Sequence, residues 1–169
     1  MVRIGLISDT HSFLDSTVID HFKDRDEIWH AGDIGELSLI QELEKYKPVR
    51  AVFGNIDNLE ITTRYPEDLW LDVEGFSILI THIAGSPPNY NPRIKKLFKT
   101  KTPDILICGH SHILKIIRDK ERNIVFINPG AAGQQGFHHM RTIMRFTLDH
   151  KEIREMNVIE LGKRGRLDH

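Results

Sequence analysis

One stretch near the start of the chain reads Ile4-Gly5-Leu6-Ile7-Ser8-Asp9-Thr10-His11, an apolar run that ends in a carboxylate and an imidazole. The run has the character of a β-strand, and side chains alternate across an extended backbone. We therefore expect Asp9 and His11 to point to the same side of the strand. Two such groups one residue apart provide half of a site for a cation.

The same arrangement recurs four times further along the chain. Each of these apolar runs ends in residues of the kinds that bind metals: 27–31 before Gly32-Asp33, 50–53 before Gly54-Asn55, 76–81 before His82, and 104–108 before Gly109-His110-Ser111-His112. In open α/β sheets, ligands bind at the carboxyl ends of the strands. Glycine precedes the ligand in three cases, as expected where a chain turns sharply and closely approaches a bound group.

Composition limits the possible classes of protein. With 169 residues and 40% hydrophobic residues, the chain predicts a single domain over residues 1–169. The 23 Lys and Arg balance 24 Asp and Glu, which argues against nucleic acid as a partner, with a local basic patch as the remaining alternative. The single cysteine, Cys108, predicts a buried, inert thiol and a reducing compartment. Neither a signal peptide nor a membrane span of about 20 apolar residues is recognisable, so we expect a cytoplasmic protein without membrane contact.

The order of the expected elements indicates the fold class. Apolar spacing predicts helices within 12–23 and 37–46, between the first three strands, which is typical of parallel βαβ units. The later part reads as β-rich and antiparallel. It comprises a hairpin over 69–81, a loop over 55–68 with room for one helical turn, a loop over 83–92, a helix over 93–101, and strands over 104–108, 113–118, 124–127, 141–148 and 153–161. This order favours an α/β protein with two sheets packed face to face and helices outside.

A glycine-rich segment, 128–136, cannot form regular structure. Its backbone amides make it either an oxyanion-binding loop or a plain connection, and the sequence favours neither. His138 and His139 follow directly.

The candidate ligands suggest more than one ion when they are counted together. Seven nitrogen and oxygen ligands exceed the about four that zinc takes, and no thiolate is among them. Two ions that share one carboxylate fit this number better. Imidazoles mixed with oxygen ligands suit Mn, Fe, Zn or Ni better than Ca or Mg.

The series Asp9-x-His11, Gly32-Asp33, Gly54-Asn55-x-Asp57, His82 and Gly109-His110-Ser111-His112 resembles the calcineurin-like metallophosphoesterases, most closely their small bacterial and archaeal phosphodiesterase branch. The resemblance runs from Asp9 to His112. It implies a four-layer α/β/β/α sandwich and two divalent metal ions, with Mn the first expectation and Ni, Fe or Zn the alternatives. It also implies a homodimer. The implied ligands are Asp9, His11, Asp33 and His112 for one ion, and Asp33, Asn55, His82 and His110 for the other, with Asp33 bridging.

The chain departs from the family pattern at Ile56. Many members carry a histidine here that protonates the leaving group, and members of the small branch often carry cysteine. An alkyl side chain transfers no proton, and a missing general acid costs roughly 10²–10⁴ in rate when the leaving group is basic. Asp57, which would orient that histidine, is expected to serve the structure of the loop. His138 is a weaker candidate for the missing acid.

These observations predict a two-metal phosphodiesterase that acts on small phosphodiesters with good leaving groups. Two ions about 3.5–4 Å apart would turn a bridging water into a hydroxide that attacks phosphorus. The expected catalytic residues are Asp33 and Asn55, with Asn55 also contacting the substrate. The alternative is a scaffold for protein partners, because a eukaryotic sorting-complex subunit is similar to the small branch. A nuclease is a third hypothesis, which the balanced charge disfavours.

Overall fold

Two five-stranded sheets form the centre of the computed structural model, which describes residues 1–165. In the first sheet the outer strand β12 pairs with β11, and β1 lies at the middle. β1, β2 and β3 run parallel, and β11 is antiparallel to β1. The strands, in spatial order, are β12 (Glu152–Lys163), β11 (Met140–Asp149), β1 (Val2–Ile7), β2 (Glu27–His30) and β3 (Val49–Ala51).

The second sheet is also mixed. Its three inner strands run parallel, and both edge strands are antiparallel to their neighbours. The strands, in spatial order, are β4 (Asp68–Val73), β5 (Phe76–Thr81), β8 (Ile105–Ile107), β10 (Ile124–Asn128) and β9 (Lys115–Asp119). Cys108, directly after β8, is buried as the sequence predicts, and burial raises the pKa of its thiol.

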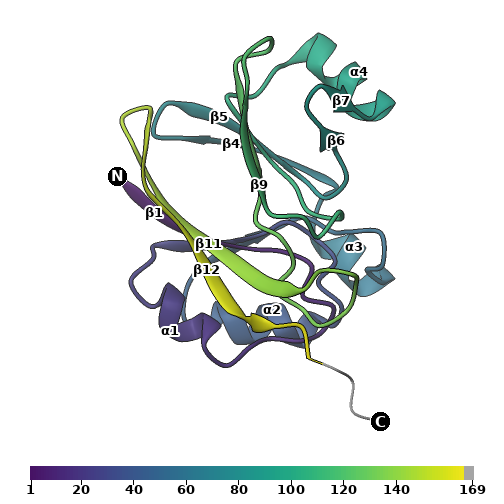
Figure 1. The fold of residues 1–169 in the computed structure, drawn as a ribbon, viewed down its shortest axis with the longest axis vertical. Helices are drawn as coiled ribbons and strands as arrows, with labels where there is room; N and C mark the ends of the chain where they lie inside the picture. Colours follow the sequence, from purple (N-terminus) through teal and green to yellow (C-terminus); the bar gives the residue numbers. More distant parts are fainter. Residues whose placement is uncertain (166–169) are drawn as a thin grey trace.

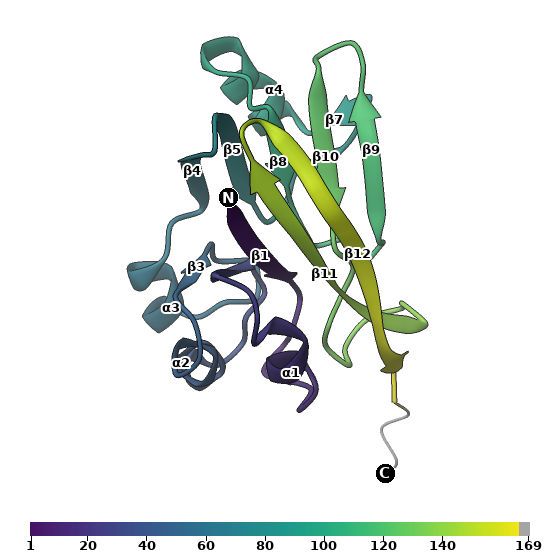
Figure 2. The same ribbon diagram turned by 90° about the vertical axis from the view of Figure 1, so that its left-hand side faces the viewer.

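Helices cover the outer face of each sheet, and the sequence prediction of four layers is confirmed. α1 (Val18–Phe22), α2 (Leu37–Glu44) and α3 (Leu59–Arg64) pack on the first sheet, and α4 (Pro92–Thr100) packs on the second. In Figure 1, α4 lies at the top and α1 and α2 lie at the bottom, with the strands between them. Figure 2 shows β11 and β12 as a long hairpin that extends toward the C-terminus. The main core lies between the two sheets.

Alternation along β1 explains why glycine interrupts its apolar run. Ile4 and Leu6 are fully buried in the core between the sheets. Gly5 faces the opposite side, where a Cβ would lie 2.6 Å from the ring of Phe22 in α1. The missing side chain therefore lets α1 pack directly on the first sheet.

Three features differ from the sequence prediction. The loop over 83–92 contains a small hairpin of β6 (Gly85–Ser86) and β7 (Asn89–Tyr90). The helical turn expected within the polar segment 55–68 is the longer helix α3, of six residues, which the Asn58 side chain caps by accepting the N–H of Ile61 at 3.2 Å. The later strands are not all antiparallel, because β8 and β10 join the second sheet parallel to β5. A local pattern identifies a strand and leaves its distant partner undefined.

No helix within residues 1–165 is long and apolar enough to cross a membrane.

Candidate metal centre

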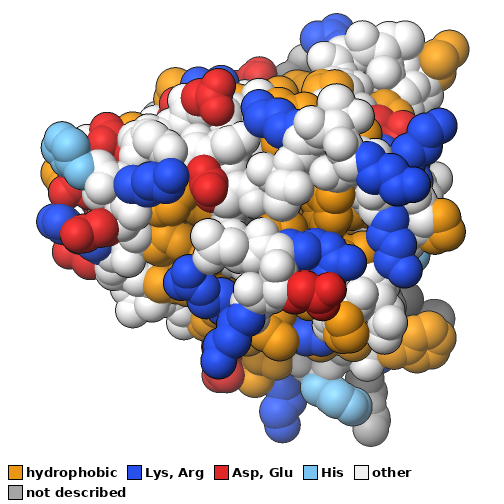
Figure 3. Space-filling view, turned by 90° about the horizontal axis from the view of Figure 1, so that it is seen from above, with side chains coloured by type: hydrophobic (Ala, Val, Ile, Leu, Met, Phe, Trp, Pro, Cys, Tyr) orange, Lys and Arg blue, Asp and Glu red, His pale blue; other side chains and the backbone are white. Residues whose placement is uncertain are grey.

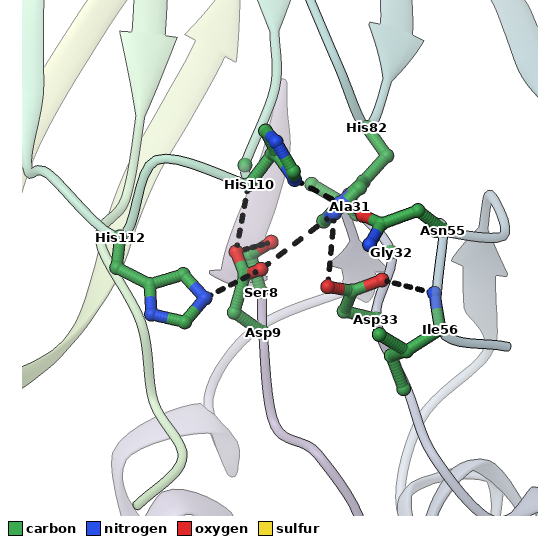
Figure 4. A network of polar contacts seen from close by, with 12 residues as sticks. Ser8, Asp9, Ala31, Gly32, Asp33, Asn55, Ile56, His82, His110 and His112 are labelled. Carbon is green, nitrogen blue, oxygen red and sulfur yellow. Dashed lines mark hydrogen bonds and ion pairs between the residues drawn. The ribbon is translucent and has the colours of Figure 1, made fainter. Parts of the chain in front are cut away.

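The seven predicted ligand residues converge where strands of both sheets end (Figure 4). β1, β2 and β3 of the first sheet lead into Asp9 and His11, Asp33, and Asn55 respectively. β5 and β8 of the second sheet lead into His82 and into His110 and His112. The site therefore lies across one end of the sandwich.

Four of these side chains form one group of possible ligands. Asp9, His11, Asp33 and His112 each offer an atom, and all four atoms lie within 4.8 Å of one another. His112 Nε2 lies 3.2 Å from Asp9 Oδ1, and His11 Nε2 lies 3.5 Å from Asp33 Oδ2. Carboxylate oxygens and imidazole nitrogens at this spacing can converge on one divalent ion.

A second group lies on the other side of Asp33. It contains Asp33, His82 and His110, whose ligand atoms also lie within 4.8 Å of one another. His82 Nε2 is 3.2 Å from Asp33 Oδ2, and Asn55 Oδ1 is 3.0 Å from His110 Nδ1. Asp33 is the one residue that belongs to both groups of possible ligands.

Buried atoms without partners test whether these residues fit metal ions. Asp9 Oδ1, His11 Nε2 and His82 Nε2 are buried and have no hydrogen-bond partner among the described residues. Such atoms are costly unless something binds them. The second ring nitrogen of His82 donates to the backbone oxygen of Ala31 at 2.7 Å, which in the neutral ring leaves Nε2 as a free acceptor. The donor set therefore fits divalent cations.

The electrostatics of the second group also favour a cation. Burial raises the pKa of Asp33, but the His82 ring beside it and the N–H of Ile56 lower the pKa more, so the net shift is downward. Burial lowers the pKa of His82, but Asp33 and Asp9 raise it more, so the net shift is upward. Both shifts show that ionised carboxylates concentrate negative potential here, and a metal ion competes with a proton for this position.

Asp9 and His11 come together for a different reason from the one predicted. β1 ends at Ile7, so the prediction of an extended strand through both residues was wrong. Asp9 and His11 instead adopt left-handed backbone conformations, with φ of 53° and 45°. Their N–H groups donate to the carbonyls of Gly32 and Asp33 at 3.0 Å each, so the turn after β1 is bonded to the turn after β2.

Left-handed backbone is a general feature of the ligands. Asp33, His110 and His112 have φ values of 54°, 70° and 60°, so five of the seven residues are in a region that non-glycine residues rarely adopt. Conformations of this kind cost free energy and persist only where the surroundings impose them. The turns are thus held in shapes that aim ligands at one point.

The glycine that precedes a ligand residue leaves space for the side chain of another ligand residue. At Gly32, whose φ is 99°, a Cβ would lie 2.6 Å from the ring nitrogen Nδ1 of His82. At Gly109 it would lie 2.5 Å from Asp9 Oδ2, and at Gly54 it would collide with the Asp33 carboxylate. The sequence analysis expected these glycines to approach a bound group closely. In the structure each of them closely approaches the side chain of a neighbouring ligand residue.

Asp57 holds two turns together, which confirms its predicted structural role. Its carboxylate accepts the N–H groups of Gly54 at 2.7 Å, Gly35 at 2.9 Å and Ile34 at 3.2 Å. The turns that carry Asp33 and Asn55 are thereby fixed relative to each other.

The glycine-rich segment 128–136 uses several of its amides within the protein. Ala132 N–H and Gly133 N–H donate to the carbonyls of Ser8 and Asp9, and Gly130 N–H donates to Asn128 Oδ1. Of the two roles considered for this segment, the contacts favour a connection that buttresses the Asp9 turn.

His138 lies beside the first group. Its ring packs edge-on against His112 with centroids 5.1 Å apart, and its Nε2 bonds to the carbonyl of Gly133 at 2.9 Å. A carbonyl only accepts, so this nitrogen carries the proton, and burial lowers the pKa of the ring. His139 is exposed, and His169 lies outside the described residues.

His30 is a residue of the site that the sequence analysis missed. It is fully buried at the end of β2, where its Nδ1 accepts the N–H of Gly32 at 3.1 Å. Its Nε2 bonds to Thr10 Oγ1 at 2.9 Å, and Thr10 Oγ1 donates to the carbonyl of Ile34. His30 therefore links the turns that carry Asp9 and Asp33. A histidine inside an apolar strand two residues before Gly32 was the available signal.

Replacing His30 is expected to remove a pH dependence of stability. Burial lowers the pKa of His30 to about 3, whereas an unfolded histidine titrates near about 6.5. Between these values the unfolded chain binds the extra proton, so the free energy of unfolding falls as the pH falls. From about pH 7 to about pH 5 this group accounts for a loss of about 2 kcal/mol, which His30→Asn should lack. Urea denaturation in chelator at both pH values measures it, and equal losses in the two proteins would contradict it.

Comparisons with known proteins identify the family of the chain. The model of the calcineurin-like phosphoesterase superfamily domain matches residues 2–151. A probable metallophosphoesterase of Methanothermobacter thermautotrophicus is 34% identical over 133 residues, which cover 76% of each chain. An archaeal phosphodiesterase structure has a TM-score of 0.72 at 24% identity, covering 93% of this chain and 99% of that chain. Vps29 of Chaetomium thermophilum has a TM-score of 0.74 at 15% identity, covering 94% of each chain. The chain therefore belongs to the calcineurin-like phosphoesterase superfamily.

Proposed function

We propose that this protein is a phosphodiesterase that uses two divalent metal ions and hydrolyses small phosphodiesters. Asp9, His11, Asp33 and His112 would hold one ion, and Asp33, Asn55, His82 and His110 would hold the other. The observation that carries the proposal is the pair of ligand groups that share Asp33. We propose Mn for both positions, with Ni, Fe or Zn as alternatives, because imidazole and oxygen ligands suit these metals.

The protein contributes binding and orientation. Two bound ions would lower the pKa of a water to near neutral and polarise the phosphoryl oxygens. The Asp33 carboxylate would be the ligand that both ions share, and the Ile56 N–H orients it by donating to its Oδ1 at 3.1 Å. Asn55 Oδ1 is turned toward His110, and the amide nitrogen of Asn55 has no acceptor within residues 1–165, so it could donate to a phosphoryl oxygen.

The side of the leaving group lacks an acid in this proposal. Ile56 is 45% exposed next to Asp33 and transfers no proton. His138 in its neutral form has already donated its one hydrogen to Gly133, so we assign it to positioning His112. Substrates whose leaving groups depart as stable anions are therefore expected to react best.

Bis-p-nitrophenyl phosphate is expected to be hydrolysed only after metal is restored. The protein is stripped with chelator, reloaded with Mn or Ni, and the release of p-nitrophenolate is followed. Because every predicted ligand atom then regains its ion, turnover should reappear with saturation near two ions per chain.

A sample reloaded with Ca is the control. Ca prefers oxygen ligands to imidazole, so this sample should hydrolyse bis-p-nitrophenyl phosphate more slowly than the Mn or Ni sample. No release of nitrophenolate by folded, reloaded protein would contradict the proposed function.

A scaffold is the second candidate. Large apolar side chains surround the site, with Ile83, Ile113 and Phe137 exposed by 37%, 63% and 98%. Exposed apolar side chains in one area are typical of protein-binding surfaces. The fold is shared with Vps29, although similarity at 15% identity shows the fold alone. Turnover by the metal-loaded protein would distinguish an enzyme from a scaffold.

A further inference from the structure

A pocket of about 300 Å³ opens directly beside His110. Ala84, Gly85 and Ser86 form one wall, at the start of the β6–β7 hairpin. Ile113 and Phe126 make its lining mainly apolar, while Ser111 and Asn128 add polar groups. An organic group attached to a phosphate bound at the metal centre would extend into this space.

Lys115 is the only Lys or Arg among the residues that line the pocket. It is half-buried, and its Nζ donates to Ser86 Oγ at 2.9 Å. Within residues 1–165 it forms no ion pair. An ammonium has three N–H donors, so two remain for a ligand. A half-buried cation without a carboxylate partner is well suited to bind an anion.

The strands fix Lys115 relative to the metal centre. Lys115 is the first residue of β9 and pairs with Asn128, the last residue of β10. The Asn128 side chain in turn donates to the carbonyl of Gly109 at 2.9 Å and to Ser111 Oγ at 3.0 Å. Asn128 therefore connects Lys115, its partner in the neighbouring strand, to the segment that carries His110. His110 and Lys115 line the same cavity from ends of neighbouring elements.

The segment of the chain that contains Lys115 is rich in positive charge. Residues 93–122 carry nine Lys and Arg and three Asp and Glu, although the whole chain carries 23 and 24. Figure 3 views the molecule from the end where α4 lies and shows Lys and Arg side chains over much of this face, with Asp and Glu side chains among them. A positive field at this end attracts substrates with more than one negative charge.

We propose that Lys115 binds a second phosphate group of the substrate, so that the preferred substrate is an organic phosphodiester with an additional phosphate on the group that enters the pocket. This inference rests on the proposed phosphodiesterase activity. The metal centre takes the scissile phosphate, the apolar walls take the organic part, and Lys115 with Ser86 takes the second phosphate. The recognition is by charge-assisted hydrogen bonds from the ammonium.

Two esters of thymidine test the proposal. Thymidine 5′-(p-nitrophenyl phosphate) and its 3′-phosphate derivative release the same p-nitrophenolate and differ only in the second phosphate. The Mn-loaded wild-type protein should prefer the derivative in kcat/KM by about tenfold or more, as a charge-assisted hydrogen bond allows. Lys115→Met should bring the ratio of the two kcat/KM values close to one, and Lys115→Arg should keep most of the preference.

Lys120→Met is the matched control, because Lys120 is an exposed lysine that follows β9 and does not line the pocket. It should leave the ratio at the wild-type value. A wild-type protein that hydrolyses both esters with equal kcat/KM would overturn the inference while leaving the proposed function intact. Equal losses on both esters in Lys115→Met would also overturn it. If the Mn-loaded protein hydrolysed none of the three substrates, neither the two thymidine esters nor bis-p-nitrophenyl phosphate, the proposed function itself would be contradicted.

Discussion

Asp33→Asn is expected to abolish stable binding of both metal ions and to lower phosphodiesterase turnover by at least about 10²–10³-fold. Asparagine has the shape of aspartate and keeps an oxygen that can accept the N–H of Ile56. The substitution therefore removes one negative charge and changes the packing little. The carboxylate that carries this charge is the one side-chain group that belongs to both sets of possible ligands. Elemental analysis gives the ions per chain, and hydrolysis of bis-p-nitrophenyl phosphate gives the turnover.

Asp104→Asn is a suitable control for the loss of a partly buried carboxylate. Asp104 accepts the N–H of Ser77 at 2.8 Å, outside the ligand groups, and its amide variant keeps an acceptor there. It should bind metal and turn over like the wild type. If Asp33→Asn retained two ions per chain and wild-type turnover, Asp33 would not be the shared ligand. Circular dichroism of both variants would show that each is folded.

The candidate site was largely predictable because its signal is local. An apolar run that stops at Asp9, Asp33 or His82 specifies both a strand and the residue at its carboxyl end. In parallel strands these ends meet at one edge, so residues far apart in sequence converge. The structure brings together the seven residues that this reasoning selected.

The remaining features depend on contacts that a local pattern does not contain. The left-handed turns at Asp9 and His11 are held by carbonyls of the turn after β2. The role of His30 depends on hydrogen bonds to Thr10 and Gly32, which become visible only in the folded structure. The parallel pairing of β8 with β5 likewise depends on long-range packing in the core between the sheets. Periodicity identifies such strands and does not identify their partners.

Ile56→His is expected to widen the range of substrates toward poor leaving groups. The Ile56 N–H donates to Asp33 Oδ1 at 3.1 Å, so a side chain at this position starts within a few ångströms of the ligands. Ile56 is 45% exposed, and a histidine should therefore fit without disturbing the core. A general acid there should raise the rate for phenyl or alkyl phosphodiesters by about 10²-fold, with little gain for p-nitrophenyl esters.

The dependence of rate on the pKa of the leaving group separates proton donation from other effects. A series of substituted phenyl phosphodiesters should give a steep decline of kcat with leaving-group pKa in the wild type and a shallow one in Ile56→His. Ile56→Gln introduces a polar side chain of similar reach that cannot donate a proton as an acid, and it should keep the steep decline. If the glutamine variant were as fast as the histidine variant on the poor leaving groups, polarity alone would explain the gain. If neither variant changed the slope, Ile56 would not lie on the leaving-group side, and the missing acid would have to be sought elsewhere around the metal centre.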